Sequence, residues 1–146
     1  MQLSLHFALT EFVNSATADE HGIDNTPSDE IIEHLTTTAH GLELVRSLLG
    51  YPLHINSGYR CPDLNKAVKG AWNSAHLTGF AADITCAEFG TPLQIVEAVV
   101  KSGIKFDQCI MEGNWVHISF DPAMRQETLT ASFDANGDAT YTHGVA

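Results

Sequence analysis

The sequence predicts a single α+β domain. Its 146 residues match the usual size of one compact domain and are too few for two. Segments with strand character are grouped between helical segments, without the regular strand–helix alternation that builds a parallel sheet. A composition of 44% hydrophobic and 17% charged residues is ordinary for a globular protein and gives no sign of disorder.

Two helices are predicted in the first third of the chain. A short helix begins with Thr10 as its N-cap, and the polar run at 14–24 is expected to be a loop. The longest helix is expected at about 28–49, where apolar residues recur at near-helical spacing. Thr26 is its expected N-cap, and Gly50 ends it because glycine readily adopts the left-handed conformation that closes a helix.

The remainder of the chain is predicted to contain short strands and two more helices. Alternating or continuous apolar runs predict the strands, and Thr91-Pro92 predicts a helix start. Strands are expected at 53–57, 80–86, 108–111 and 115–120, and helices at 61–68 and 92–102. Around Asn136-Gly137, the segments 129–133 and 139–141 are predicted to form an edge hairpin.

The charge balance restricts the possible partners. Seven Lys and Arg stand against eighteen Asp and Glu, which gives a formal net charge of −11. A field of this sign repels phosphate backbones and anionic lipid surfaces, so we expect no nucleic-acid partner and no membrane insertion. The first residues show no basic region followed by a long apolar stretch, so neither a signal peptide nor a transmembrane helix is expected.

The cysteines indicate a reduced protein. Cys61, Cys86 and Cys109 form no CxxC pair, and an odd number cannot all pair within one chain. We expect them to be reduced and mostly buried, which fits synthesis in a reducing cytosol. None of them stands beside a histidine, so a cysteine nucleophile is not expected.

Three stretches carry residues suited to metal chemistry. His76 and Asp83 are seven residues apart, too far for one helical turn, so they must come from a loop and the strand that it enters. His117 lies within an apolar strand, and Arg60 follows the end of another. Catalytic zinc takes three protein ligands and keeps one position open for water, which two imidazoles and one carboxylate allow. A cation would also neutralise Asp83, whose charge among apolar residues is otherwise costly.

Each of these residues has a simpler interpretation when it is taken alone. His117 on its own more often indicates a strand histidine bonded to a backbone carbonyl. Asp83 is as typical of a strand-end carboxylate, and Arg60 of a solvated surface cation. The spacing alone does not decide between these interpretations.

The wider pattern is more specific. It consists of Ser57-Gly58-Tyr59-Arg60-Cys61-Pro62, Leu64-Asn65, the SxHxxGxAxD stretch at 74–83, and Trp115-Val116-His117-Ile118-Ser119. Together these segments resemble the zinc D-Ala-D-Ala metallopeptidase family, which includes D-Ala-D-Ala carboxypeptidases, dipeptidases and phage endolysins. The resemblance is closest to short single-domain members from phages and prophages, and it runs from about Phe7 to Phe120.

The resemblance implies a fold of the Hedgehog and DD-peptidase type. This is a small α+β domain with a mostly antiparallel sheet and helices packed on one side. We therefore predict a peptidase-type domain at residues 1–120. Residues 121–146 are predicted to be a C-terminal extension packed on the same domain.

The resemblance also assigns the site. It implies that His76, Asp83 and His117 bind one zinc ion per chain. Arg60 matches the family arginine near the substrate, which would polarise the scissile carbonyl or hold a carboxylate. We further predict that Ser74, Tyr59 and Trp115 contact the substrate, with a loop-shaping role as the alternative for the serine.

The general base is the least defined of the assignments. Relatives place an acid three residues before the last ligand or a histidine two before it, where this chain has Asn114 and Trp115. Glu112 is the nearest acid, and it would reach the site if a tight turn at 113–114 joins two paired strands. Asp107 is a more distant candidate.

These observations predict a zinc peptidase that hydrolyses amide bonds in bacterial peptidoglycan stem peptides, as a carboxypeptidase or an endopeptidase. The alternative is a zinc-containing wall-binding module that has lost its base. We expect a monomer, made in a host cytoplasm as a phage or prophage protein, which acts on the wall after release or as part of a particle.

Overall fold

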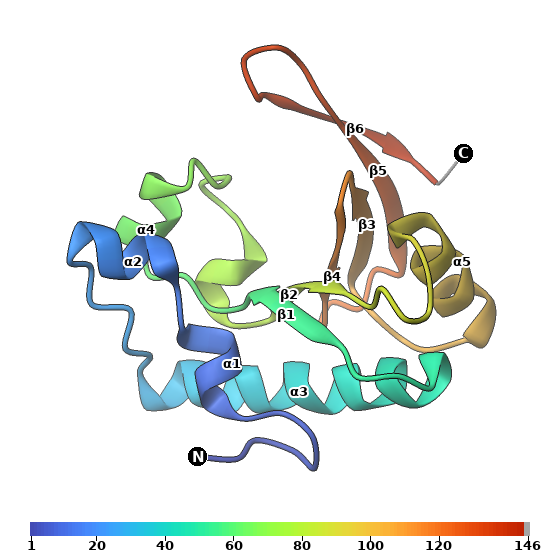
Figure 1. Ribbon diagram of the computed structural model, residues 1–146, viewed down its shortest axis with the longest axis horizontal. Helices are drawn as coiled ribbons and strands as arrows, with labels where there is room; N and C mark the ends of the chain where they lie inside the picture. The colour runs from blue at the N-terminus through green and yellow to red at the C-terminus, as the bar shows by residue number, and fades with distance from the viewer. Residues whose placement is uncertain (145–146) are drawn as a thin grey trace.

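The computed structural model describes residues 1–144, so residues 145–146 of the predicted C-terminal extension lie outside the described residues. The chain forms one small α+β domain, which confirms the predicted fold class (Figure 1). Its helices are α1 (Leu9–Val13), α2 (Ala16–His21), α3 (Asp29–Leu49), α4 (Pro62–Ala67), α5 (Pro92–Ser102) and the 3₁₀ turn η1 (Ala75–Thr78).

One six-stranded sheet forms the centre of the domain. Its strands are β1 (His54–Ser57), β2 (Ala81–Thr85), β3 (Gln108–Glu112), β4 (Trp115–Ser119), β5 (Glu127–Phe133) and β6 (Ala139–His143). Their order across the sheet is β1-β2-β4-β3-β5-β6. All neighbours are antiparallel except β3 and β5, which are parallel, so the sheet is mostly antiparallel as predicted.

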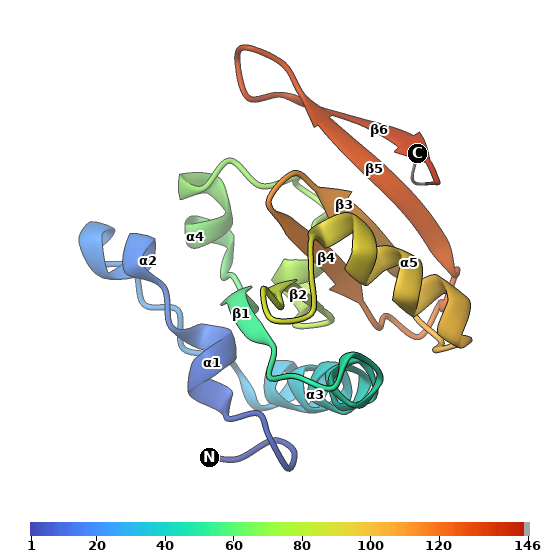
Figure 2. The same ribbon diagram turned by 45° about the vertical axis from the view of Figure 1, so that its right-hand side comes forward.

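The two faces of the sheet differ in character. Because successive side chains of a strand point to opposite faces, Ile84 and Val116 turn one way and Asp83 and His117 the other. The first pair belongs to the main hydrophobic core, which α3 and α5 cover. Figures 1 and 2 show these two helices along one side of the sheet. The opposite face carries the polar residues of the predicted site.

The first two helices differ from the prediction. α1 begins at Leu9, and its N-cap is Ala8 rather than Thr10. The Glu11 carboxylate accepts the Ala8 N–H at 2.7 Å, which is the bond that the third helical residue makes back to the N-cap backbone in a capping box. The predicted loop at 14–24 contains α2, which Ser15 caps through a 3.2 Å bond from Ala18 N–H.

The long helix starts slightly later than predicted. Its N-cap is Ser28, whose hydroxyl accepts the N–H of Ile31 at 3.3 Å, and not Thr26. The Asp24 side chain accepts the backbone N–H of Thr26, which places that residue in a turn ahead of the helix. Gly50 ends the helix as predicted, with φ +78°.

The C-terminal hairpin is part of the same sheet. β5 pairs with β3 through Gln108 to Met111, and β6 pairs with β5 on the outer side. The turn between them is held by the Asp134 carboxylate, which accepts the N–H groups of Asn136 and Asp138 at 2.9 Å each. The hairpin therefore extends the face that carries the predicted site, and it stands out above the rest of the sheet in Figure 1.

The cysteines are unpaired, in agreement with the prediction. Cys86 and Cys109 are buried and Cys61 is partly buried. Burial raises the pKa of the Cys109 thiol to about 12, so this group stays protonated at neutral pH. Within residues 1–144, no helix has the length and apolar character needed to cross a lipid bilayer.

Candidate metal centre

His76 lies on the 3₁₀ turn η1 and is almost completely buried. Ser74 caps this turn by accepting the His76 backbone N–H at 3.2 Å. Gly79 ends it with φ +83°, a left-handed conformation that glycine adopts without strain, and the chain then enters β2. The short turn thus directs one imidazole towards the face of the strand that follows it.

Asp83 and His117 come from neighbouring strands. They are direct partners in the antiparallel pairing of β2 with β4, so their side chains stand next to each other on one face. Both are buried, at 7% exposure each, in strands whose other residues are mainly apolar. The sheet therefore brings together residues that are far apart in the sequence.

The three side chains converge on one point. His76 Nε2 lies 3.1 Å from Asp83 Oδ1, and His117 Nδ1 lies 3.2 Å from each of these two atoms. A tetrahedral zinc site with bonds of about 2.0–2.1 Å separates its ligand atoms by roughly 3.3 Å. The observed triangle has nearly this size, so the donor set fits zinc in both chemistry and spacing.

The proton positions also favour a cation at this point. His76 Nδ1 lies 2.6 Å from the Gly58 carbonyl oxygen, which only accepts, so this nitrogen carries the proton. In the neutral ring, Nε2 then presents a lone pair towards the Asp83 carboxylate. Two acceptors facing each other repel unless a positive charge lies between them. A backbone carbonyl that fixes the outer nitrogen in this way is usual for histidine ligands of metals.

The pKa values of the three groups agree with this arrangement. Burial lowers the pKa of His76, and the nearby Asp83 charge only partly offsets this effect. Burial raises the pKa of Asp83, but His76 and His117 outweigh it and hold that pKa well below its usual range. For His117, burial lowers the pKa, while the hydrogen bond and charge of Asp83 raise it, with a net increase. The carboxylate is therefore ionised and ready to bind a cation.

Gly58 allows the supporting carbonyl to reach His76. A Cβ atom added at this residue would stand 2.6 to 2.8 Å from the backbone and Cβ of Phe12 in α1. Real Cβ contacts essentially never fall below 3.0 Å, so only glycine fits this close approach. The first helix of the chain thereby fixes the position of the carbonyl that orients a metal ligand.

Arg60 lies beside the metal ligands. Its guanidinium is 3.7 Å from Asp83 Oδ2, and it donates to Asn65 Oδ1 at 2.9 Å and to Ser57 Oγ at 3.3 Å. Burial lowers its pKa, while the charges of Asp83 and Glu112 raise it. Arg60 is thus a partly buried cation held by hydrogen bonds and not a solvated surface residue.

Two buried asparagines hold the loop around Arg60. The Asn25 amide group donates to the carbonyl oxygens of Val13 and Tyr59 at 2.9 and 3.0 Å, and its oxygen accepts from Cys61 N–H. The amide group of Asn65 donates to a backbone carbonyl at 2.9 Å. Asn65 belongs to the sequence pattern but has no role assigned by it, and Asn25 gives no sequence signal at all, because a lone asparagine in a polar segment does not indicate burial.

Glu112 lies on the same face as the metal ligands. Ile110 on β3 is paired with His117. Glu112 stands two residues after Ile110 and is paired with Trp115. Diagonal neighbours of this kind have Cα atoms about 7–8 Å apart, within reach of a glutamate side chain. Burial raises the pKa of Glu112, and the His117 charge lowers it less strongly. The indole of Trp115 donates to its carboxylate at 3.1 Å.

The predicted tight turn between β3 and β4 is present. Gly113 and Asn114 form a two-residue connection, in which Gly113 has φ +72°. A glycine at the first position of such a loop suits the turns that join adjacent antiparallel strands. The turn joins β3 to β4 and sets Glu112 two residues from Ile110, the partner of His117.

Tyr59 and Asp107, two other candidate site residues, mainly take part in packing and in holding the chain. Tyr59 belongs to the main core and is only 9% exposed, which leaves little of its ring for the predicted contact with substrate. Asp107 is bound by Arg125 through two side-chain bonds of 2.9 Å and one backbone bond of 3.0 Å. It stands at the opposite end of β3 from Glu112, so it serves as an anchor for the chain before β5.

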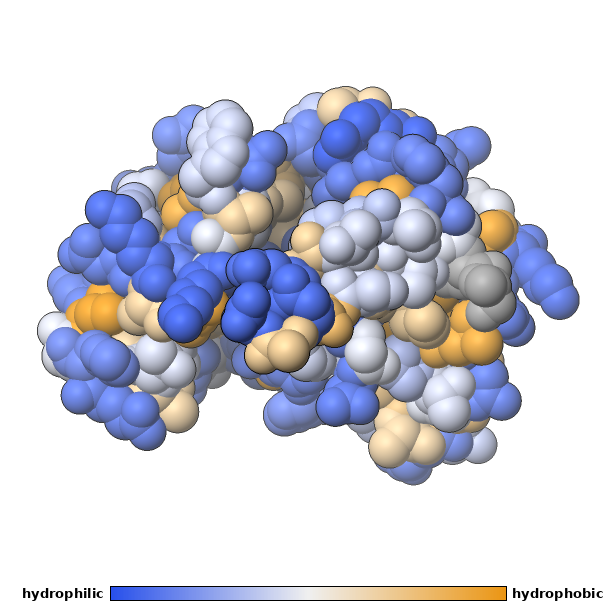
Figure 3. Space-filling view, turned by 90° about the horizontal axis from the view of Figure 1, so that it is seen from above, coloured by the Kyte–Doolittle hydropathy of each residue, from blue (hydrophilic) through white to orange (hydrophobic). Residues whose placement is uncertain are grey.

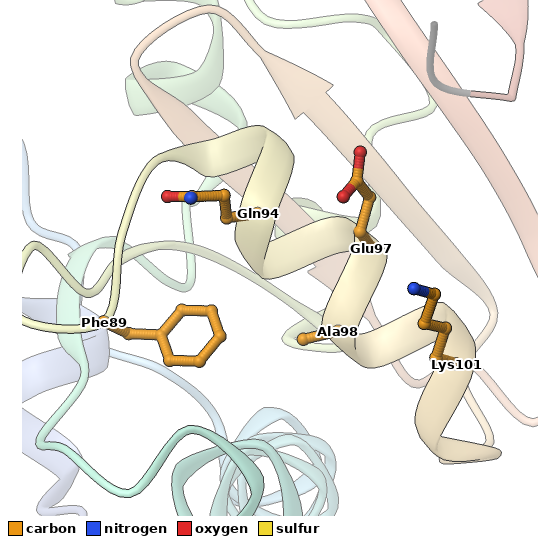
Figure 4. Close-up of a pocket in the computed structure, with 5 residues that line it drawn as sticks. All are labelled: Phe89, Gln94, Glu97, Ala98 and Lys101. Atoms are coloured by element: carbon orange, nitrogen blue, oxygen red, sulfur yellow. The ribbon is translucent and has the colours of Figure 1, made fainter.

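The surface is hollowed above the ligand-bearing face. Figure 3 looks down on this side and shows a hollow between the part that carries α4 and the part that carries the hairpin. A separate shallow pocket runs along α5, lined by Phe89, Gln94, Glu97, Ala98 and Lys101 (Figure 4). Since α5 covers the core side of the sheet, this pocket lies on the other side of the sheet from the metal ligands.

A family model described as Peptidase M15 matches residues 5–119. The chain belongs to the peptidase M15 family. This is the family expected from the sequence motifs, and its match includes His76, Asp83, His117, Arg60 and Glu112. A search of curated proteins finds no match. As a member of the peptidase M15 family, whose enzymes are zinc-dependent hydrolases of peptides, the chain has a fold and a ligand cluster suited to that chemistry.

Proposed function

We propose that this chain hydrolyses amide bonds in the peptide stems of bacterial peptidoglycan, using zinc held by His76, Asp83 and His117. The observation that carries the proposal is the convergence of these three buried donors, with Glu112 on the same sheet face. Three protein ligands leave a position for water, as in catalytic rather than structural zinc sites. The choice of peptidoglycan as substrate rests on the resemblance to D-Ala-D-Ala metallopeptidases.

The protein residues divide the work of the reaction. When bound, zinc polarises a carbonyl group and lowers the pKa of a coordinated water to roughly 7. Glu112 accepts a proton from the attacking water and returns it to the leaving amine. Its raised pKa makes the carboxylate a better proton acceptor, and a pKa nearer the working pH balances taking the proton from water against returning it to the amine.

Arg60 supplies a fixed positive charge at the site. Its bonds to Asn65 and Ser57 hold the guanidinium in place before substrate arrives. In the proposal, this charge stabilises the oxyanion that develops in the transition state or binds a substrate carboxylate. It also lies 3.7 Å from Asp83 Oδ2, so it adds positive charge beside the metal ligands.

The place of action is a further part of the proposal. We propose a phage or prophage protein that is made in the cytoplasm of a bacterial host and reaches the wall after lysis or within a particle. The same chemistry serves a carboxypeptidase, which removes a terminal residue, and an endopeptidase, which cuts within the stem. A monomer is sufficient for both, because all proposed ligands come from one chain.

The test combines metal analysis with product analysis. The purified protein is measured for bound zinc and incubated with defined muropeptides, and the products are identified by mass spectrometry. We expect about one zinc per chain and cleavage of one bond type. Glu112→Gln should keep the zinc and lose at least a hundredfold in kcat, since general bases contribute about 10²–10⁴-fold. His117→Ala should lose both, and Glu97→Gln on the exposed face of α5 should change neither.

A second candidate function is a wall-binding module without turnover. The observation behind it is that Asn114 and Trp115 stand where relatives carry their base, and neither accepts a proton. If zinc binds and every muropeptide is bound but left intact, this function replaces the peptidase. If no metal binds, the assignment of the three ligands is wrong.

A further inference from the structure

The face of the sheet that carries the metal ligands continues onto the C-terminal hairpin. Ile110 on β3 is paired with His117 on one side and with Leu129 of β5 on the other. Directly paired residues point to the same face, so this row leads from the ligands to the hairpin. Ile110, Leu129 and Ala131 form a small apolar cluster of their own, separate from the main core. This cluster borders the site on the hairpin side.

Tyr141 lies on β6, in the row of cross-strand neighbours that is two residues further along β5 than the row of Ile110 and Leu129. It pairs with Ala131, and so it points to the same face as the cluster. The last residue pair between β3 and β5 is Met111 with Thr130. Continuing this parallel register by one residue puts Ala131 beside Glu112. Two strand spacings of about 4.8 Å then separate the backbones of Glu112 and Tyr141 by roughly 10 Å. Between them on this face stands only the small side chain of Ala131, which is buried.

The surroundings of Tyr141 suit a binding role. Its side chain is 49% exposed, so it is available to a ligand while part of its ring is packed. Burial raises the pKa of its phenol, and the charges of Glu112 and Asp83 raise it further. The hydroxyl group therefore remains protonated at neutral pH and can donate a hydrogen bond. The effect of both acids on Tyr141 is consistent with its position facing the site.

We propose that the β5–β6 hairpin forms one wall of the substrate groove, and that Tyr141 binds the substrate peptide next to the bond that is cut. This inference rests on the proposed peptidase function. The phenol donates to a backbone carbonyl of the peptide, and its half-exposed ring covers a small apolar side chain beside the buried cluster. Alanine residues of a peptide stem present such side chains. The hairpin lies beyond residues 5–119, which the family match covers.

The experiment separates the hydroxyl from the ring and binding from turnover. Steady-state cleavage of a muropeptide is compared for the wild type, Tyr141→Phe and Tyr141→Ala, all zinc-loaded. Tyr141→Phe should raise KM roughly threefold to tenfold, the value of one hydrogen bond, with kcat within about twofold. Tyr141→Ala should raise KM roughly tenfold or more, because the ring is also lost. Tyr51→Ala, which removes a 42% exposed tyrosine after α3, is the matched control and should behave as wild type.

A second measurement makes the result independent of catalysis. Affinity for the same muropeptide is measured by calorimetry in the zinc-loaded Glu112→Gln background, with and without the Tyr141 substitutions. If the wild type cleaves and the Tyr141 variants match it in KM and in affinity, the wall role is wrong while the peptidase function stands. If nothing is cleaved but Tyr141→Ala lowers affinity, the function fails and the wall role stands. Absence of any binding overturns both. Circular dichroism confirms that each variant is folded, and Tyr141→Phe preserves the packing in any case.

Discussion

At the scale of single residues, the hydrogen bond between His76 and the Gly58 carbonyl should determine how tightly the site binds zinc. Gly58→Ala should lower zinc affinity about tenfold to a hundredfold, the usual effect of disturbing a partner of a metal ligand. The reason is steric, since the new methyl group must push the loop away from Phe12 and take the carbonyl with it. Competition with a chromogenic chelator measures the change.

The matched control for this substitution is Gly90→Ala. There the added Cβ meets the far end of the flexible Gln94 side chain, which can rotate away. Zinc affinity should stay at the wild-type value. Equal affinity in Gly58→Ala and the wild type would show that the carbonyl does not orient His76.

The sequence predicts the metal ligands better than their supports. Asp83 and His117 stand out because polar residues in apolar strands require a partner, and the structure gives them each other and His76. Nothing in the sequence indicates that Asn25 is buried or that Gly58 meets Phe12, because these contacts join segments that local pattern does not relate. Tyr59 was predicted to contact substrate from its motif position, but core packing buries its ring.

At the scale of elements, the Asp107–Arg125 pair fixes the entry to β5. Arg125 lies between Met124 and Gln126, which both have positive φ, so the contacts hold a backbone path that non-glycine residues rarely adopt. Arg125→Ala should lower the free energy of unfolding by about 1–2 kcal/mol, a value reduced because the guanidinium is half exposed. Urea unfolding at neutral pH measures the loss.

The contribution of the Asp107–Arg125 pair to the free energy of unfolding should depend on pH. The hydrogen bond from Arg125 lowers the pKa of Asp107 below its ordinary value of 3.8. The stabilisation is therefore complete above about pH 3.8 and is lost as the pH falls through the lower, folded-state pKa. The difference between wild type and Arg125→Ala should shrink over that acidic range. Lys105→Ala removes a nearby exposed cation and should show no such pH-dependent difference; a constant difference for Arg125→Ala would exclude the ion pair as its cause.

Helices were predicted correctly where the apolar periodicity was long or where residues that begin and end helices marked both ends. The helix α3 shows many apolar repeats, and α5 begins with Thr91-Pro92 and ends at Gly103. The six-residue helix α2 was missed because one and a half turns show no periodicity, and its Ser15 cap stands among other polar residues. The parallel pairing of β3 with β5 was not predicted either, because register between distant strands depends on tertiary packing.

At the scale of the whole molecule, zinc should stabilise the fold. The three ligands join η1, β2 and β4, so a bound ion ties together segments that separate on unfolding. At free zinc one hundred times its dissociation constant, the gain is about 2.7 kcal/mol. This corresponds to a rise in Tm of roughly 5–15 °C for a domain of this size. Thermal unfolding with zinc and after chelation measures it.

His117→Ala serves as the control in this experiment. It removes one of the three donors, so its Tm should not depend on zinc. An equal zinc-dependent rise in this variant would place the ion elsewhere on the chain. The net charge of −11 makes weak binding at surface carboxylates a real competitor, and the variant separates the two.

The parallel pairing of β5 with β3 also limits how this protein can be trimmed or redesigned. Without the hairpin, the backbone groups of Gln108 to Met111 would lose their partners and leave an open strand edge beside the metal ligands. Such an edge invites pairing with another chain, so a version shortened after Phe120 would tend to aggregate. In contrast, the outer strand β6 and its turn touch no metal ligand in the sheet, and exchanging or lengthening them would reshape the groove while the metal centre stays intact. The hairpin is thus the natural place to alter substrate range by design.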